Sequence, residues 1–142
     1  MFKHQTLTIC TQEYNQMIVI TDHLRKAVAE SGVQNGLAAV VTLHTTTGIS
    51  VNEALECLES DIGDLLGRLA PEDHPYAHAR ILRSYGSTAG NPTGHLKAML
   101  TGNHCLFPVV GGQLVMGQAQ DIYFYEFDGP AKRTITFTVT GE

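Results

Sequence analysis

Alternating and continuous apolar runs mark the first half of the chain as strand-rich. Thr6–Cys10 alternates polar and apolar positions with period two, as a half-buried strand does. Met17–Ile20 is a second apolar run, rich in β-branched residues. The nearly unbroken apolar stretch Leu37–Leu43 predicts a central strand buried on both faces. Gly48 separates that strand from a short alternating strand at Ile49–Val51.

A helical period of apolar positions predicts three helices. Thr21 is a candidate N-cap for the first, and Gly32 is a plausible end for it. The second is a longer amphipathic helix, ended by Pro71, because one helical face collects its apolar residues. That face holds Leu55, Leu58, Ile62, Leu65, Leu66 and Leu69. A short third helix is expected to start near His95.

The last third of the chain predicts antiparallel sheet. Gly111-Gly112 joins the apolar runs Cys105–Val110 and Gln113–Met116, which is a two-residue hairpin signal. Asp121–Phe127 is an aromatic strand, and Thr134–Val139 alternates throughout. These runs favour short connections between neighbouring strands.

Residues 71–93 contain several Pro and Gly residues and no clear period, so they predict a long loop. Loops of that length are uncommon in compact domains and often carry function. Strands outnumber helices along the chain. We therefore expect one domain, residues 1–142, of the α+β class, with a mainly antiparallel β-sheet packed with a few helices.

Composition narrows the classes of function. The formal charge is -5 with only 9 Lys and Arg, which argues against a nucleic-acid binder that depends on phosphate neutralisation. No apolar run reaches the roughly 18 to 20 residues of a membrane span, and the N-terminus has no apolar signal core. We expect a cytoplasmic protein with no nucleic-acid or membrane partner. Three distant cysteines predict neither a disulfide framework nor a thiolate zinc site.

The segment His44–Glu53 is the first candidate for chemistry. His44 closes the apolar strand, and Asn52 and Glu53 stand at the far end of the next one. Imidazoles together with a carboxylate suit a divalent metal site or an acid–base site. The alternatives are a structural strand-end histidine and a glutamate that supports the first turn of the following helix.

Two further histidines lie in turn-rich segments. His78 falls inside the predicted loop, and His95 stands near a helix N-terminus, where free N–H groups favour an anion. Asn91 and Lys97 could assist there, although Gly/Pro/Asn clusters are also ordinary turn chemistry.

Two charged residues in the last third also invite a functional interpretation. Glu126 lies in an aromatic strand, as either a paired or functional group or a solvated edge-strand residue. Arg133 could bind phosphate or pair with a carboxylate. No P-loop, dinucleotide-binding fingerprint, nucleophile elbow or H-E-x-x-H motif is present.

Five short motifs occur in an order that resembles the YjbQ-like family, small proteins described as secondary thiamine-phosphate synthase enzymes. They are His-Thr-Thr-x-Gly-Ile-x-Val-Asn-Glu at 44–53, Tyr-x-His at 76–78, His-Leu-Lys-Ala at 95–98, Gly-x-x-Gln-x-Ile-Tyr at 117–123 and Glu-Phe-Asp-Gly-Pro at 126–130. The similarity covers nearly the whole chain. The matching positions of interest are His44, Asn52, Glu53, His78, His95, Gln120 and Glu126.

The resemblance implies an α+β subunit that forms a homotrimer, with histidine-bearing pockets near subunit contacts. It also implies a divalent metal and an ability to make thiamine phosphate from a pyrimidine-methyl pyrophosphate and a thiazole phosphate. Two departures bear on the substrate. Gln118-Ala119 stands where family members commonly have Thr-Trp, and the segment Gly90–Gly94 lacks the aspartates common before the histidine of the His-x-Lys motif.

Three functions follow as hypotheses. In the leading one, His44, His78 and His95 bind a metal, with Zn²⁺ favoured over Mg²⁺ or Mn²⁺ because imidazole suits transition metals. Catalysis would fall to His44, Glu53 and Glu126. A small phosphorylated substrate would contact Asn52, Asn91, Lys97, Gln120 and Arg133. The second hypothesis is a metal-dependent hydrolase of a small phosphorylated or amide substrate, and the third is a non-enzymatic trimer that binds a small anion. An all-histidine anion pocket without a metal is the simplest competitor to the leading hypothesis.

Overall fold

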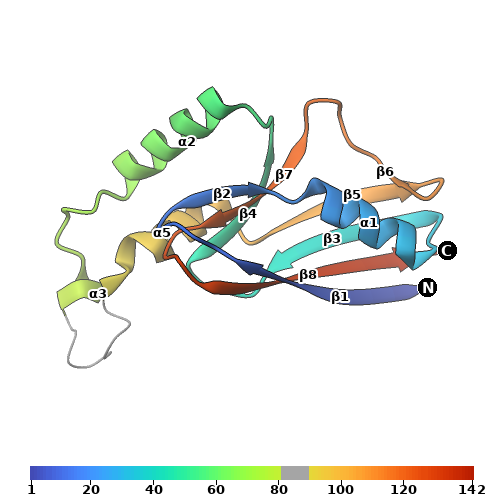
Figure 1. The fold of residues 1–142 in the computed structure, drawn as a ribbon, viewed down its shortest axis with the longest axis horizontal. Helices are drawn as coiled ribbons and strands as arrows, with labels where there is room; N and C mark the ends of the chain where they lie inside the picture. The colour runs from blue at the N-terminus through green and yellow to red at the C-terminus, as the bar shows by residue number, and fades with distance from the viewer. Residues whose placement is uncertain (81–89) are drawn as a thin grey trace.

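The computed structural model describes residues 1–80 and 90–142 and contains two antiparallel sheets (Figure 1). The larger sheet has five strands in the order β1-β8-β3-β5-β6. Its strands are β1 (Phe2–Cys10), β8 (Lys132–Gly141), β3 (Asn35–Thr42), β5 (His104–Val110) and β6 (Gln113–Leu114). All their pairings are antiparallel, and β1 pairs with β8 over its whole length. The expected α+β class with mainly antiparallel strands is confirmed.

The smaller sheet has three strands in the order β2-β7-β4. Its strands are β2 (Gln16–Val19), β7 (Asp121–Glu126) and β4 (Thr47–Asn52). Because β7 is the middle strand, Glu126 pairs with Gln16 on one side and Thr47 on the other. The interpretation of Glu126 as a solvated edge-strand residue is therefore wrong, because Glu126 is fully buried on the middle strand.

The main core lies between the two sheets and helix α1 (Thr21–Ser31). Val40 and Phe137 come from the large sheet, Ile122 and Phe124 from the small one, and Leu24 from α1. Each of these side chains is at most 2% exposed. Burial of this apolar surface is the main force that holds the two sheets together.

A second, smaller core lies on the other face of β7. There Tyr123, Tyr125 and Phe127 stack along the strand, with successive ring centroids 5.8 and 5.6 Å apart. They pack against Leu66 of helix α2 (Glu56–Leu69) and Ala98 of helix α5 (Pro92–Thr101). Both faces of β7 are thus covered, which explains its dense aromatic sequence.

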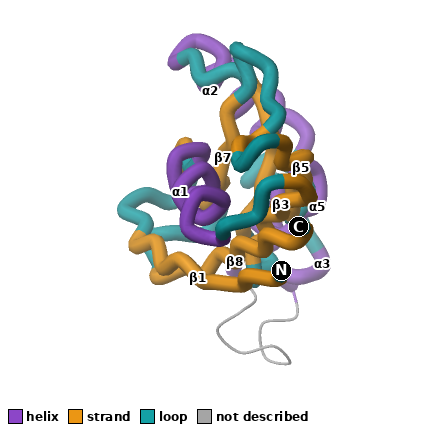
Figure 2. Tube along the Cα trace, turned by 90° about the vertical axis from the view of Figure 1, so that its right-hand side faces the viewer, coloured by secondary structure: helices purple, strands orange, loops and turns teal. Residues whose placement is uncertain are grey.

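Helix α2 stands away from the rest of the molecule (Figures 1 and 2). Only Leu66 of its apolar face is buried, while Leu55, Leu65 and Leu69 are 43%, 48% and 59% exposed. The predicted amphipathic helix is confirmed, but within one chain most of its apolar face has no cover.

Helix α5 lies very close to β4 and to the end of β7 because two glycines permit it. A Cβ at Gly48 would lie 1.9 Å from Thr101 Oγ1, and a Cβ at Gly94 would lie 2.9 Å from the Phe127 carbonyl oxygen. Real side chains do not tolerate such distances. Gly48 therefore lies inside β4, where it accommodates α5, instead of separating two strands as the sequence suggested.

Several boundaries predicted from the sequence are confirmed. Gly32 ends α1 in a left-handed conformation with φ of 75°, and Gly111 and Gly112, with φ of 60° and 76°, form the hairpin between β5 and β6. The predicted third helix is α5, which begins at Pro92, three residues before His95. Helix α3 (Ala77–Arg80) occupies part of the predicted loop, and residues 81–89 of that loop lie outside the described residues.

Two local predictions are wrong. Thr21 is not an N-cap, because it lies inside α1 and its hydroxyl donates to Asp121 Oδ1 at 2.6 Å and accepts from the Ile122 N–H at 2.9 Å. The strand Leu37–Leu43 is central but not buried on both faces. Ala38 and Val40 are buried, whereas Leu37 is 45% exposed. In the described part of the chain, no helix is long and apolar enough to cross a membrane.

Candidate functional site

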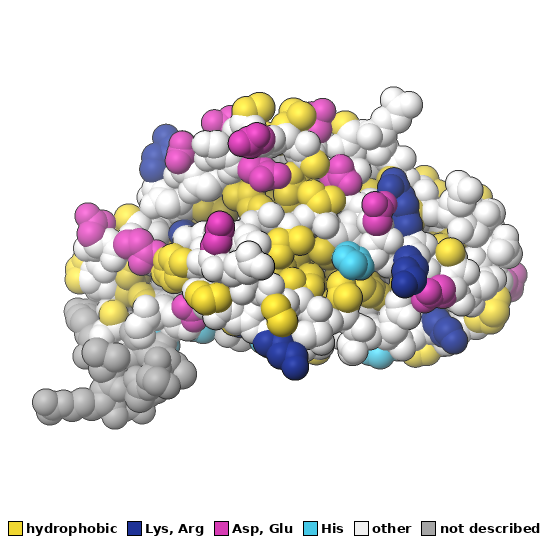
Figure 3. All heavy atoms as spheres, in the orientation of Figure 1, with side chains coloured by type: hydrophobic (Ala, Val, Ile, Leu, Met, Phe, Trp, Pro, Cys, Tyr) yellow, Lys and Arg dark blue, Asp and Glu magenta, His cyan; other side chains and the backbone are white. Residues whose placement is uncertain are grey.

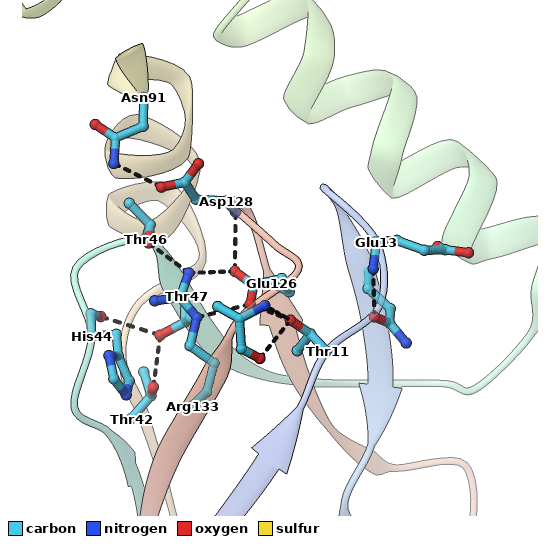
Figure 4. Close-up of polar contacts among 12 residues, drawn as sticks. Thr11, Glu13, Thr42, His44, Thr46, Thr47, Asn91, Glu126, Asp128 and Arg133 are labelled. Carbon is cyan, nitrogen blue, oxygen red and sulfur yellow. Dashed lines mark hydrogen bonds and ion pairs between the residues drawn. The ribbon is translucent and has the colours of Figure 1, made fainter. Parts of the chain in front are cut away.

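His44 is held by the turn between β3 and β4. The Thr47 hydroxyl donates to the His44 carbonyl at 3.2 Å and contacts the Thr42 hydroxyl at 2.7 Å, which fixes the turn (Figure 4). The backbone N–H of Thr134 donates to His44 Nε2 at 2.9 Å. Because a backbone N–H can only donate, Nε2 is an acceptor, and the neutral ring carries its proton on Nδ1.

The electrostatic surroundings keep His44 neutral at neutral pH. Burial lowers the pKa of His44 below its ordinary value of 6.5, and the Arg133 guanidinium lowers it further. Glu126 raises the pKa in opposition, but its effect is the smallest of the three. The neutral ring of His44, with the proton on Nδ1, lines a cavity of about 340 Å³ together with His95.

Glu126 and Arg133 form a buried ion pair beside this turn (Figure 4). Arg133 donates from Nε to Oε1 at 2.8 Å and from Nη2 to Oε2 at 2.6 Å. Thr11 Oγ1 donates to Oε1 at 2.7 Å, and the backbone N–H of Asp128 donates to Oε2 at 3.0 Å. Arg133 Nη2 also donates to Thr46 Oγ1 at 2.9 Å.

These contacts bear on two residues that the sequence placed at the site. Glu126 is fully buried and accepts four hydrogen bonds, and Arg133 is 8% exposed. The carboxylate alternative for Arg133 is the one observed. Together the pair ties the turn after β7 to β8 and to the loop that carries His44, which is a positioning role.

His78 belongs to a hydrogen-bonded chain that ends on a carboxylate. Asn91 Nδ2 donates to Asp128 Oδ2 at 2.8 Å, and Asn91 Oδ1 lies 3.0 Å from His78 Nε2. An amide oxygen can only accept, so His78 Nε2 carries a proton in this arrangement. Asn91, held by Asp128, thus orients the ring of His78.

His95 contacts His78 and lines a cavity together with His44. Its ring meets that of His78 edge to face, with centroids 5.1 Å apart. It lines the cavity of about 340 Å³ with His44 and a second cavity of about 430 Å³ with Tyr76 and His78. Among the described residues, the ring nitrogens of His95 make no hydrogen bond. We call His44, His78 and His95 the histidine site.

Asn52, Glu53 and Gln120 lie elsewhere in the chain. Strand β4 separates Asn52 from the turn of His44, and its two ends are roughly 17 Å apart at the usual strand rise. Glu53 and Gln120 are exposed, and their local contacts are the hydrogen bonds of Glu53 N–H to Asn52 Oδ1 and of Gly117 N–H to Gln120 Oε1. Within one chain they do not join the histidine site.

Lys97 also lies apart from the histidines, on another side of α5. It lines a groove of about 610 Å³ beneath α2, together with Glu59 and Phe127. His95 and Lys97 are two positions apart on a helix, and such residues do not face the same way. The structure therefore places Lys97 in a different cavity from the histidines.

The three predicted metal ligands are not gathered into a metal centre in the described part of the chain. In residues 1–80 and 90–142, no group of three or more His, Cys, Asp or Glu side chains is placed to hold an ion. Residues 81–89 contain none of these four residue types. His44 Nε2 is already engaged by the Thr134 N–H. The predicted zinc, magnesium or manganese site remains a prediction.

Sequence reasoning missed Asp128 and two polar clusters. Asp128 stood out in the sequence only as part of the Glu-Phe-Asp-Gly-Pro motif, although it anchors Asn91. The missed clusters are Tyr123 with Glu59, whose hydrogen bond is 2.6 Å, and Glu72 with Tyr14 and Thr93. Their partners are far apart in sequence, so no local signal marks them.

A family model described as "UPF0047 protein YjbQ-like" matches residues 5–142. A UPF0047 protein of Archaeoglobus fulgidus is 37% identical over 129 residues, which cover 91% of this chain and 94% of that protein. A UPF0047 protein of Methanothermobacter thermautotrophicus is 34% identical over 138 residues, 97% of this chain and 92% of the relative.

Solved structures show the same fold. A protein of unknown function from Sulfolobus solfataricus superposes with a TM-score of 0.92 at 29% identity, covering 100% of this chain and 99% of the other. An uncharacterised protein of the yjbq/upf0047 family from Clostridium acetobutylicum gives a TM-score of 0.86 at 36% identity, covering 96% and 99%.

Proposed function

The chain belongs to the UPF0047 YjbQ-like family, and from this premise we propose that the histidine site binds a small phosphorylated molecule and exchanges a proton with it through His95. The observation that carries the proposal is the position of His95. Its imidazole has no hydrogen-bond partner among the described residues and lines both a cavity of about 430 Å³ and a cavity of about 340 Å³.

An imidazole suits this role because its charge changes near neutral pH, so it can donate or accept a proton there. Neutral His44 offers an Nδ1–H donor from one side, and Asn91 and Asp128 hold the ring of His78 on the other. The position of His95 in the first turn of α5 also favours an anion.

For the reaction, the family resemblance points to thiamine-phosphate formation. In that reaction the thiazole nitrogen attacks the methylene carbon of the pyrimidine substrate, a C–N bond forms, the C–O bond breaks, and pyrophosphate leaves with the electron pair. Protonated His95 would donate a proton to the departing pyrophosphate, and the donors around it would offset the developing charge. The proposal requires no metal for this step.

The decisive experiment is an assay of thiamine phosphate from the two precursors with purified protein. His95→Gln should lower kcat/KM by about 100-fold or more, the usual cost of losing a general acid. His23→Gln, at an exposed position on α1, is the matched control and should leave the rate unchanged. No product at any protein concentration would refute the synthase assignment.

A metal is tested separately. Elemental analysis of the purified protein, and of the protein after incubation with Zn²⁺, Mn²⁺ or Co²⁺, shows whether the chain binds an ion. Stoichiometric metal that is lost in His44→Ala and His95→Ala would restore the metal-assisted transferase and the metal-dependent hydrolase. A metal-free wild type that gains none would remove both.

A second candidate function is a non-enzymatic binder of a small anion. It is favoured because neither carboxylate proposed for catalysis is available to His95 among the described residues: Glu126 is paired with Arg133, and Glu53 lies beyond the far end of β4. Phosphate binding detected by NMR, abolished in His95→Gln and unaccompanied by any turnover, would establish this function instead.

We also propose that the protein is a homotrimer, as the family resemblance implies. The exposed leucines of α2 support self-association, because one chain leaves Leu65 and Leu69 about half exposed. Assembly would cover this apolar surface.

A further inference from the structure

We propose that the groove beneath α2 is a second binding site, separate from the histidine site, for a small zwitterion whose anionic group sits on Lys97. The groove has a volume of about 610 Å³, within the usual range for small-molecule sites. It lies between α2, the start of β2 and the inner side of α5, and Figure 3 shows the hollow with hydrophobic side chains on its floor.

Lys97 is the basis of the proposal. Its side chain is only 7% exposed, yet no carboxylate oxygen of the described residues lies within 4.0 Å of its ammonium and it makes no hydrogen bond there. Every side-chain nitrogen or oxygen atom that is fully buried in the described residues has a hydrogen-bond partner. Since Lys97 Nζ has none, this atom is not fully buried, and we infer that it is exposed in the groove that Lys97 lines.

The Lys97 stem is buried while its ammonium opens onto the groove without a carboxylate partner among the described residues, so an anion that enters the groove would meet an unpaired charged donor. A carboxylate or a phosphate could serve, since both offer oxygen acceptors to the three Nζ–H groups. The apolar floor beside Lys97, made by Met17, Leu66 and Phe127, suits a short hydrocarbon segment next to the anionic group.

The rim of the groove is negatively charged and therefore favours a positively charged group on the ligand. Glu13, Glu56 and Glu59 line it, so three carboxylates stand against one ammonium. Glu59 is held in place because Tyr123 donates its hydroxyl to Oε2 at 2.6 Å. A simple anion would be repelled by this rim, whereas a molecule with an amine at its other end would be attracted. The electrostatics therefore select a zwitterion.

The test is an NMR titration of the full-length protein with matched probes. O-phosphoethanolamine and 4-aminobutyrate are the two zwitterions, and ethyl phosphate, butyrate and butylamine carry one kind of charge each. The zwitterions should shift the backbone amides of Leu66, Lys97 and Phe127 at millimolar concentration, and the single-charge probes should bind at least tenfold more weakly. Comparison of the two zwitterions identifies phosphate or carboxylate as the preferred anion.

Variants locate the binding. Lys97→Met, which keeps the apolar stem, should weaken zwitterion binding by tenfold to a hundredfold, the cost of a lost charged hydrogen bond. Lys97→Arg should restore part of it, and Lys132→Met at an exposed lysine should have no effect. Glu59→Gln should reduce the preference for zwitterions over simple anions. His95→Gln should change none of these results, which separates this site from the histidine site.

Absence of groove shifts with every probe would overturn the proposal. So would equal binding of zwitterions and simple anions, or binding unaffected by Lys97→Met. If Lys97→Met does not fold, the Glu59→Gln titration and the wild-type preference among the probes decide the question.

Discussion

At the scale of single residues, the buried Glu126–Arg133 pair carries the largest desolvation cost, because two charges have been removed from water. Breaking such a pair from one side leaves the other charge buried and uncompensated. We predict that Glu126→Gln lowers the free energy of unfolding by about 3–5 kcal/mol, measured by urea denaturation. In Glu126→Gln with Arg133→Met, the loss should be smaller than the sum of the two single losses. A single-variant loss below about 1 kcal/mol would contradict this account.

Glu126 also predicts how stability changes in acid. Burial raises the pKa of its carboxyl, but the hydrogen bonds from Arg133, Thr11 and the Asp128 N–H outweigh burial and hold the pKa below the ordinary 4.5. As the pH falls, the carboxyl of residue 126 therefore takes up a proton in the unfolded chain at a higher pH than in the folded protein. The stabilisation is complete above pH 4.5 and is lost as the pH falls through the folded-state pKa. Unfolding free energies measured below pH 4.5 should fall less steeply for Glu126→Gln than for the wild type.

His44 gives a second pH effect in a different window. Its folded-state pKa lies below 6.5, so the unfolded chain takes up a proton first as the pH falls below 6.5. Stability should therefore decline below pH 6.5, down to the folded-state pKa. His44→Gln keeps an acceptor for the Thr134 N–H but cannot titrate, so its stability should depend less on pH than that of the wild type just below pH 6.5. Identical pH profiles for the two proteins would show that His44 does not contribute.

The sequence identified the residue types of the site but not their partners. His44, His78 and His95 could be selected from the motifs, and the last two do lie in contact. Nothing local could show that Thr46 and Arg133, 87 residues apart, hold the turn of His44, or that Thr11 reaches Glu126 from 115 residues away. Such pairs depend on how the strands are ordered, which the apolar pattern does not contain.

At the scale of elements, predictions from the local sequence pattern were confirmed where the structure depends on the residues of that element alone. The Gly111-Gly112 hairpin and the Gly32 helix end depend on backbone conformations that glycine adopts readily. The predictions for Thr21 and for Leu37–Leu43 failed because their surroundings depend on neighbouring elements. The Thr21 hydroxyl hydrogen-bonds to Asp121 and Ile122 at the start of β7. No element covers the outer face of β3 at Leu37, which stays 45% exposed.

The approach of α5 to β4 supplies an element-scale prediction. Gly48→Ala forces a Cβ against Thr101 Oγ1 and should lower the free energy of unfolding by about 1–3 kcal/mol. Gly67→Ala in α2 is the matched control, since its Cβ would meet nothing within 4 Å and alanine favours a helix. It should stabilise by about 0.5–1 kcal/mol in the same thermal or urea unfolding measurement. A harmless Gly48→Ala would mean that α5 can shift without cost.

At the scale of the whole molecule, the exposed leucines of α2 predict association. Light scattering after size exclusion should give three times the mass of one chain. Leu65→Glu with Leu69→Glu should lower the mass to that of one chain, because charged side chains prevent burial of this face. Leu37→Glu, at a comparably exposed leucine of β3, should leave the mass unchanged. A monomeric wild type would reject the trimer.

The division of the predicted site also belongs to this scale. The sequence placed His95 and Lys97 in one motif, and the fold sends them into different cavities on two sides of α5. Helical geometry alone predicts that positions two apart diverge. It does not predict that α2 would overhang one of them, since that depends on the stacking of Leu66 on the aromatic row of β7.

The order of strands in the large sheet has a consequence for how the protein is made. β8, the last strand of the chain, lies between β1 and β3, and the two termini meet where Met1 N–H donates to the Gly141 carbonyl. A chain still under synthesis thus carries β1 and β3 with nothing between them. The large sheet can close only once β8 has been synthesised, so this half of the fold forms through contacts distant in sequence.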